Sequence, residues 1–149
     1  MNKLAPTMRV LVADDDEDHR FLTIRALRKA KGKAVEVEGV RDGREALDYI
    51  ERRGRFADRA RPHLLVLDLK MPRLNGLEVL ERLKGDPDLC TIPIVMLSAS
   101  DRPEDVDAAY RRGSNSYVTK PSGPGGMREG VRAMSEYWTS IAELPEPPQ

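Results

Sequence analysis

The sequence predicts an α/β fold, a doubly wound sheet of five parallel strands in the order 2-1-3-4-5. Two observations carry this prediction. First, short apolar runs alternate five times with segments of helical periodicity, and parallel strands need such helical crossovers. Second, the apolar run 64–67 leads straight into Asp68, with Pro72 and Gly76 close behind, as expected of a strand buried on both faces. The order 2-1-3-4-5 is a common choice for a sheet of this size.

The expected strands are 8–13, 34–40, 64–67, 92–97 and 116–119. The first, third and fourth are apolar runs, which favours a place in the middle of the sheet. The second alternates valine with glutamate, which is typical of an edge strand exposed on one face. The expected helices are roughly 17–31, 42–54, 74–85, 101–112 and 127–141. Most repeat apolar residues at helical spacing, and the first four end near a glycine.

We expect one domain, because 149 residues suit a single core. The predicted division is an N-terminal extension (1–7), the domain (8–142) and a proline-rich tail (143–149). The tail cannot continue a helix, and we expect it to be disordered or to lie along a partner. A glycine-rich break at 122–126 loosens the entry to the last helix.

The amino-acid composition argues against several classes of protein. The 25 basic and 25 acidic residues cancel, whereas nucleic-acid binders carry a basic excess. The single cysteine, Cys90, cannot form an internal disulfide, which favours a reducing cytoplasm. No apolar run approaches the length of a membrane span or of a signal-peptide core. The arginine-rich loop 54–62 is interpreted as a solvated loop, with a partner-docking surface as the alternative.

Polar residues follow four of the predicted strands. The carboxyl ends of parallel strands meet at one edge, so we expect a shared pocket there. The residues that meet are Asp14, Asp15, Asp68, Ser98 and Lys120. Two carboxylates about 4 Å apart repel by roughly 4 kcal/mol at an effective dielectric of about 20, so three of them require cations. Lys120 offsets one charge, and a hard oxygen-ligand set suits Mg²⁺ for the rest.

The two histidines stand apart from this pocket in the sequence. His19 and His63 are interpreted as surface or strand-end residues rather than metal ligands, since no His/Cys cluster suits zinc. A site with Mg²⁺, a lysine and a hydroxyl around one further carboxylate suits phosphoryl transfer. Asp68, at the end of the middle strand, is the expected nucleophile.

These residues, in this order, resemble the response-regulator receiver family of two-component signalling. The resemblance covers about residues 8–141. The motifs that carry it are Asp14-Asp15, Asp68 followed by Met71-Pro72 and Asn75-Gly76, Ser98-Ala99, Gly113, and Tyr117 three residues before Lys120-Pro121. The resemblance implies the flavodoxin-like receiver fold and a phosphorylatable switch, which catalyses only its own phosphorylation and dephosphorylation.

The resemblance also implies a role for each matching residue. Asp68 would accept the phosphoryl group, and Asp15, Asp68 and the backbone carbonyl of Lys70 would ligate Mg²⁺, with Asp14 acting through water. Ser98 and Lys120 would contact the phosphoryl group.

Two further roles concern the switch and the backbone. Ser98 and Tyr117 would form the coupled switch. The bond before Pro121 would be cis.

The loop 54–62 and the ending Tyr137-Trp138…Leu144-Pro145 are similar to single-domain response regulators that partner bacterial phytochromes. This narrower resemblance implies a phytochrome-type sensor histidine kinase as partner. With no output domain predicted, the signal is expected to leave through contact with a downstream protein or by passing on the phosphoryl group. The residues 123–126 depart from the family pattern after Lys120-Pro121, which puts the start of the last helix in question.

Two alternative functions stay open, together with one hypothesis about the oligomeric state. A Mg²⁺-dependent phosphatase of the haloacid-dehalogenase type would use an aspartyl phosphate, but it needs a second Asp where this chain has Lys70. A receiver-like interaction module without phosphorylation would leave the full pocket unused. A homodimer through Tyr137, Trp138 and Ile141 is a separate hypothesis, set against simple packing of these residues on the sheet.

Overall fold

The computed structural model describes residues 7–120 and 126–149. Its sheet confirms the predicted topology: five parallel strands in the order β2-β1-β3-β4-β5. The strands are β1 (Met8–Ala13), β2 (Val35–Val40), β3 (Leu64–Leu67), β4 (Ile94–Ser98) and β5 (Ser116–Thr119). As the alternating pattern predicted, β2 is an edge strand.

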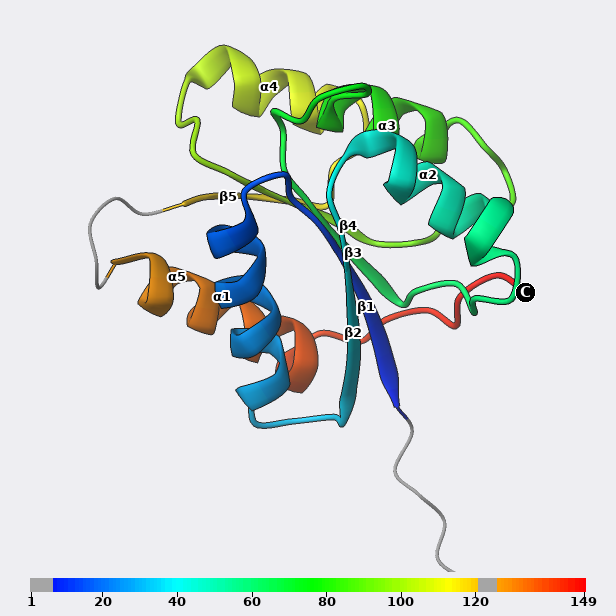
Figure 1. The fold of residues 1–149 in the computed structure, drawn as a ribbon. Coiled ribbons are helices and arrows are strands. Elements are labelled where there is room, and N and C mark those ends of the chain that lie inside the picture. The colour runs from blue at the N-terminus through cyan, green and yellow to red at the C-terminus, as the bar shows by residue number, and fades with distance from the viewer. Residues whose placement is uncertain (1–6, 121–125) are drawn as a thin grey trace, which may run out of the picture.

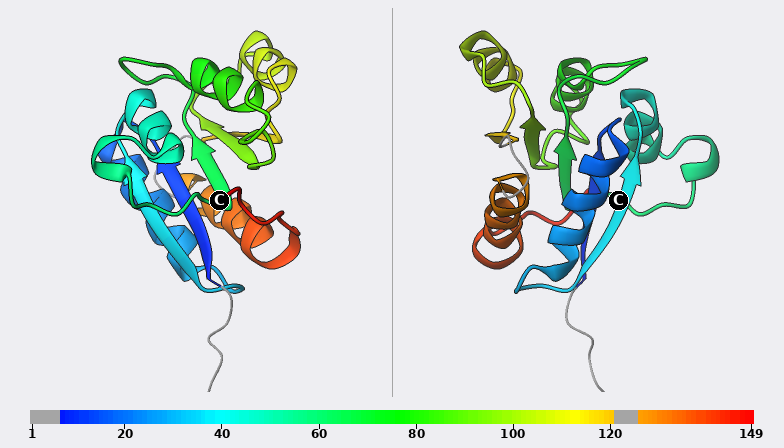
Figure 2. Two further views of the ribbon diagram at one scale, coloured as in Figure 1. Left: turned by 90° about the vertical axis from the view of Figure 1, so that its right-hand side faces the viewer. Right: turned by 60° about the vertical axis from the view of Figure 1, so that its left-hand side comes forward.

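Helices cover both faces of the sheet. The helices are α1 (Glu17–Lys29), α2 (Gly43–Glu51), α3 (Gly76–Lys84), α4 (Pro103–Arg111) and α5 (Gly126–Glu136). Two packed apolar clusters correspond to the two faces. Helices α1 and α5 lie on one face, and α2, α3 and α4 lie on the other (Figure 1; Figure 2 shows the layers from two more sides). This is the three-layer arrangement expected of a doubly wound sheet.

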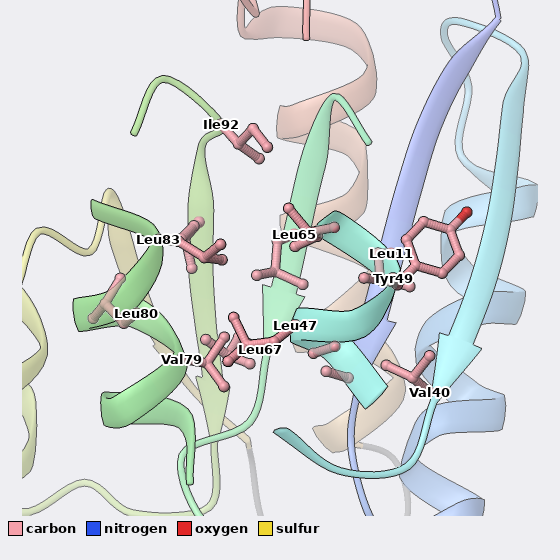
Figure 3. Close-up of a cluster of buried hydrophobic side chains, with 14 of the residues drawn as sticks. Leu11, Val40, Leu47, Tyr49, Leu65, Leu67, Val79, Leu80, Leu83 and Ile92 are labelled. Atoms are coloured by element: carbon pink, nitrogen blue, oxygen red, sulfur yellow. The ribbon is translucent and has the colours of Figure 1, made fainter. Parts of the chain in front are cut away.

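The core explains why β3 is a continuous apolar run. All four residues of β3 are fully buried, with alternate side chains in each of the two clusters. Figure 3 shows the larger cluster, in which Leu65 and Leu67 lie between α2 and α3. A strand that buries both faces has no room for the polar alternation seen in β2.

Short polar side chains start three of the helices. Asp16, Asp42 and Asn75 each accept a hydrogen bond from the backbone N–H three residues later. At Asn75 the Glu78 carboxylate also accepts from the N-cap backbone, which completes a capping box. Such caps each contribute about 1 kcal/mol. These caps also set the residue at which each loop between a strand and the following helix ends.

Most element boundaries differ by one to three residues from the sequence expectation, and three of the differences have a local cause or shape. Helix α1 ends at Lys29, because Ala30 already adopts an extended backbone. Strand β4 begins at Ile94 instead of residue 92, since Pro93 has no N–H for the ladder. The last helix begins at Gly126, and its final turn, Tyr137–Ile141, widens into a π-helix.

The prediction that the tail is disordered or lies along a partner is wrong. Residues 142–149 lie against the chain's own domain, and Leu144 packs on the cluster beneath α1 and α5. The Arg61 side chain donates to the backbone carbonyl of Gln149 at 2.8 Å. The tail therefore crosses from the end of α5 towards the loop before β3 (red in Figure 1).

The arginine-rich loop 54–62 is more ordered than a solvated loop. Its first residues form a 3-10 helix, Gly54–Phe56, which buries the Phe56 ring. The Arg55 guanidinium stacks over that ring at 4.3 Å and pairs with Glu45 at 2.9 Å. Arg59 pairs with Glu38 at 3.2 Å. The chain's own carboxylates thus neutralise much of this basic loop.

No helix within 7–120 or 126–149 has the length and apolar content needed to cross a membrane.

His63 links the starts of β1 and β3, and we expect it to make stability depend on pH. Its Nδ1 accepts from the Arg9 backbone N–H at 2.9 Å, so its ring must be neutral there. Burial, and then the Arg9 charge, lowers the pKa of His63 below 6.5. Below that pH the unfolded chain binds a proton that the folded chain does not, so stability falls as pH decreases. His63→Gln keeps an acceptor and should flatten this dependence in urea unfolding.

The comparison is made at about pH 7.5 and about pH 5.5, on either side of the pKa of a free histidine. The wild type should lose more stability than His63→Gln between these two values. Equal losses in the two proteins would contradict the role assigned to His63.

Candidate functional site

The sheet places four polar residues at one edge. Asp14 follows β1, Asp68 follows β3, Ser98 ends β4 and Lys120 follows β5. Backbone hydrogen bonds extend the ladder past the strand ends: Asp68 N–H donates to Ala13 at 2.9 Å, and Lys120 N–H donates to Ser98 at 2.6 Å. The main chain therefore holds these residues side by side, as the sequence predicted.

Three carboxylates converge at this edge. Asp14, Asp15 and Asp68 each offer an oxygen, and these oxygens lie within 4.8 Å of one another. Asp14 and Asp68 are buried, whereas Asp15 is exposed. Hard oxygen ligands at this spacing suit a divalent cation. The acidic triad is thus a candidate metal site.

Lys120 is the cation that the structure provides. Its ammonium lies 2.7 Å from an oxygen of Asp14 and 3.4 Å from an oxygen of Asp68, and all three side chains are buried. One positive charge between two carboxylates, with Asp15 nearby, leaves net negative charge in the pocket. The pocket therefore remains attractive to a further cation.

His19 lies closer to the pocket than the sequence analysis placed it. It is partly exposed, as expected of a surface residue, but its Nδ1 lies 3.1 Å from the Lys120 ammonium. The sequence carried no signal for this contact, because His19 lies in the first turn of α1 and the rotation of that helix sets its distance from Lys120.

The pKa of Asp68 is raised from 3.8 to about 7. Burial is the largest cause, since it disfavours the charged carboxylate. The Lys120 ammonium lowers the pKa, and the neighbouring Asp14 carboxylate raises it again. A carboxyl group with a pKa this high is poorly stabilised as an anion. A cation that enters the pocket would therefore stabilise its charged form.

The loop after Asp68 requires a glycine at position 76. A Cβ on Gly76 would lie 2.2 Å from the Asp68 carbonyl oxygen. The Gly76 N–H donates to the Leu69 carbonyl at 2.8 Å, which folds the loop back at the start of α3. Lys70 is exposed in this loop, and the metal-ligand role of its carbonyl stays a prediction.

The two predicted switch residues both contact Ser100, in the loop after β4. The buried Ser98 hydroxyl accepts from the Ser100 N–H at 3.2 Å. The Tyr117 hydroxyl donates to the Ser100 carbonyl at 2.8 Å, and its half-buried ring packs on the core. The structure thus brings Ser98 and Tyr117 to one loop. Pro121, with its predicted cis bond, lies outside the described residues.

Comparison with known proteins places this geometry in a family. The model of the response regulator receiver domain matches residues 10–132. A probable methanogenesis regulatory protein, FilR2 of Methanothrix harundinacea, is 34% identical over 138 residues, which cover 93% of this chain and 88% of that protein. The response regulator Rcp1 of Synechocystis sp. is 32% identical over 140 residues, which cover 94% of each chain.

Comparison with solved structures supports the same family assignment. The phosphorylated cyanobacterial phytochrome response regulator RcpA matches with a TM-score of 0.89 and 35% identity, over 95% of this chain and 100% of that one. The Mn²⁺-bound form of Rcp1 matches with a TM-score of 0.88 and 30% identity, over 93% of this chain and 99% of that one. With its sheet order, its acidic triad and these relatives, the chain belongs to the response regulator receiver domain family.

Proposed function

We propose that this chain is a stand-alone response regulator, which accepts a phosphoryl group from a sensor histidine kinase on Asp68. The observation that carries the proposal is the convergence of three carboxylates and one lysine at the carboxyl edge of the sheet. Asp68 is the carboxylate at the end of the middle strand, flanked by Asp14 and Lys120. The chain would act in the cytoplasm, where a kinase meets its regulator.

Asp68 would act as the nucleophile. A carboxylate oxygen of Asp68 attacks the phosphorus of the donor; the new P–O bond forms as the P–N bond of a phosphohistidine breaks. The imidazole leaves with the electron pair and is protonated. The product is an acyl phosphate on Asp68.

The other pocket residues would support this transfer. Asp15, Asp68 and the Lys70 carbonyl would hold Mg²⁺, with Asp14 acting through water; the oxygen donor set of the triad fits this ion. When bound, Mg²⁺ supplies positive charge that neutralises the phosphoryl oxygens. The Lys120 ammonium would pair with a phosphoryl oxygen, and the Ser98 hydroxyl would donate to another.

Ser98 and Tyr117 would carry the signal out of the pocket. If the Ser98 hydroxyl turns to the phosphoryl group, it gives up the Ser100 N–H. The loop after β4 then moves, and Tyr117 is bound to that loop through the Ser100 carbonyl. Phosphorylation would thus shift the population between two arrangements of the α4–β5 surface, which a downstream protein reads.

We infer that the kinase is of the phytochrome type. Support comes from the likeness to the phytochrome response regulator RcpA over nearly the full length of both chains. Nucleic acid is not among the proposed partners, because the 25 basic and 25 acidic residues leave no basic excess.

Removal of the metal tests the proposed chemistry. Incubation with Mg²⁺ and a small acyl phosphate should add one phosphoryl group per chain, seen by intact-mass spectrometry. The same incubation with EDTA should add none, since the triad then repels the phosphodonor. Equal phosphorylation with and without the metal would contradict the proposed role of the triad.

We also propose that the chain forms a homodimer through the end of the last helix. Tyr137 and Ile141 lie four residues apart at the end of this helix and are 47% and 69% exposed, whereas Trp138 packs against the core. Tyr137→Ser with Ile141→Ser should lower the sedimentation coefficient to that of a monomer. A wild type that sediments as a monomer would remove the proposal.

A further inference from the structure

A basic groove lies between α1 and α5. These two helices cover the face of the sheet away from α2, α3 and α4 (Figure 1). Its volume is about 370 Å³. Half-buried apolar residues of α1 and its C-terminal end, Leu22, Ala26 and Ala30, line it. Exposed cationic side chains surround these residues. The cations are Arg25, Lys29, Lys31, Arg128 and Arg132.

The described residues do not neutralise these cations. Within the described residues, none of the five lies within 4.0 Å of a carboxylate oxygen. The carboxylate that lines the groove, Glu136, accepts from the backbone N–H of Lys31 at 2.7 Å. The loop before β3 differs, since Arg53 pairs with Glu51 at 3.1 Å and Arg55 pairs with Glu45. Five cations without a carboxylate partner in the part of the chain that the structure describes therefore gather around this groove.

We propose that the groove binds an oligophosphate chain, either as inorganic polyphosphate or as the phosphate chain of a nucleotide. Arg25 and Lys29 stand one turn apart on α1, and Arg128 and Arg132 stand one turn apart on α5, so cations approach from both walls. The planar guanidinium fork of arginine matches phosphate oxygens in pairs.

The shape of the groove favours a short ligand over a protein segment. The hydrogen bond from Lys31 to Glu136 joins the end of α1 to the end of α5 and closes the groove there. A partner helix would have to run out through this end. A volume of about 370 Å³ lies in the range of small-ligand sites.

Calorimetric titration of the full chain with inorganic triphosphate tests the proposal. The buffer holds EDTA and about 0.15 M salt, which screens weak surface attraction. We expect one triphosphate per chain. Arg25→Gln with Arg132→Gln should weaken binding roughly 100-fold, at about tenfold for each charge-assisted hydrogen bond. The matched control, Arg53→Gln with Arg55→Gln, removes equal charge elsewhere and should bind as the wild type does.

Parallel titrations with ATP and with a glutamate-rich peptide distinguish a nucleotide, a free phosphate chain and an acidic protein segment as ligands of the groove. Tighter binding of ATP than of triphosphate supports a nucleotide, whose base would rest on the apolar residues. Equal binding of the two supports the phosphate chain alone. Absence of triphosphate binding by the wild type, equal weakening in both double variants, or binding of the acidic peptide in place of triphosphate would overturn the proposal. Thermal unfolding curves show that each variant is folded.

Discussion

Asp68→Asn is expected to be more stable than the wild type in metal-free buffer near pH 8, and to accept no phosphoryl group. The pKa of Asp68 is raised from 3.8 to about 7, chiefly by burial. Between these values the folded chain binds more protons than the unfolded chain, so stability falls as pH rises, and above pH 7 the whole cost is present. An amide of the same shape removes this cost, which is on the order of 2–4 kcal/mol.

Urea unfolding at several pH values measures the effect. The gain of Asp68→Asn should shrink as pH falls towards 4, where the carboxyl is protonated in the folded chain. Asp14→Asn is the matched control: it removes the closer partner of Lys120, at 2.7 Å, and should not stabilise the fold. If Asp68→Asn is less stable than the wild type at every pH, burial of the charged carboxylate is not the main cause of the raised pKa of Asp68.

Gly76→Ala is expected to destabilise the fold by about 3 kcal/mol, the upper end of the usual cost of overpacking, because the new methyl group would meet backbone atoms that cannot rotate away. The new methyl group would lie 2.2 Å from the Asp68 carbonyl oxygen and 2.9 Å from the Leu69 Cα. Both are backbone atoms of the loop that carries the acceptor. The clash must therefore move Asp68 itself, and phosphorylation should slow even in the folded fraction.

Gly54→Ala is the matched control, because it removes glycine's backbone freedom without introducing a steric clash. Gly54 has a φ of +58°, and a Cβ there would meet no atom within 4 Å. Its replacement should cost only about 1 kcal/mol, the conformational term alone. Chemical unfolding of both variants gives the comparison, and equal losses would contradict the close approach at Gly76.

The sheet was predictable because its strands are marked by local patterns. Leu64–Leu67 is an apolar run whose residues are all buried, and the valine–glutamate alternation of β2 marked an edge. The strand ends then place Asp14, Asp15 and Asp68 together by topology alone. The fold and the acidic pocket thus follow from periodicity and from the rule that ligands bind at the carboxyl ends of strands.

Contacts between distant segments were not predictable in this way. The distance from His19 to Lys120 depends on the rotation of α1 about its axis. The packing of Leu144 on the core and the hydrogen bond from Arg61 to Gln149 depend on tertiary structure, since a proline-rich segment has no periodic pattern of its own. Pairing of loop arginines such as Arg55 with carboxylates of α2 likewise needs the folded chain.

Phosphorylation of Asp68 is tested most directly by locating the modified residue. After incubation with Mg²⁺ and a small acyl phosphate, borohydride reduces an acyl phosphate on aspartate to homoserine, and peptide mass spectrometry finds its position. We expect homoserine at position 68 and at no other aspartate. Homoserine at Asp14 or Asp15 instead, or none in a protein shown to be folded, would contradict the assignment of Asp68 as the phosphoacceptor.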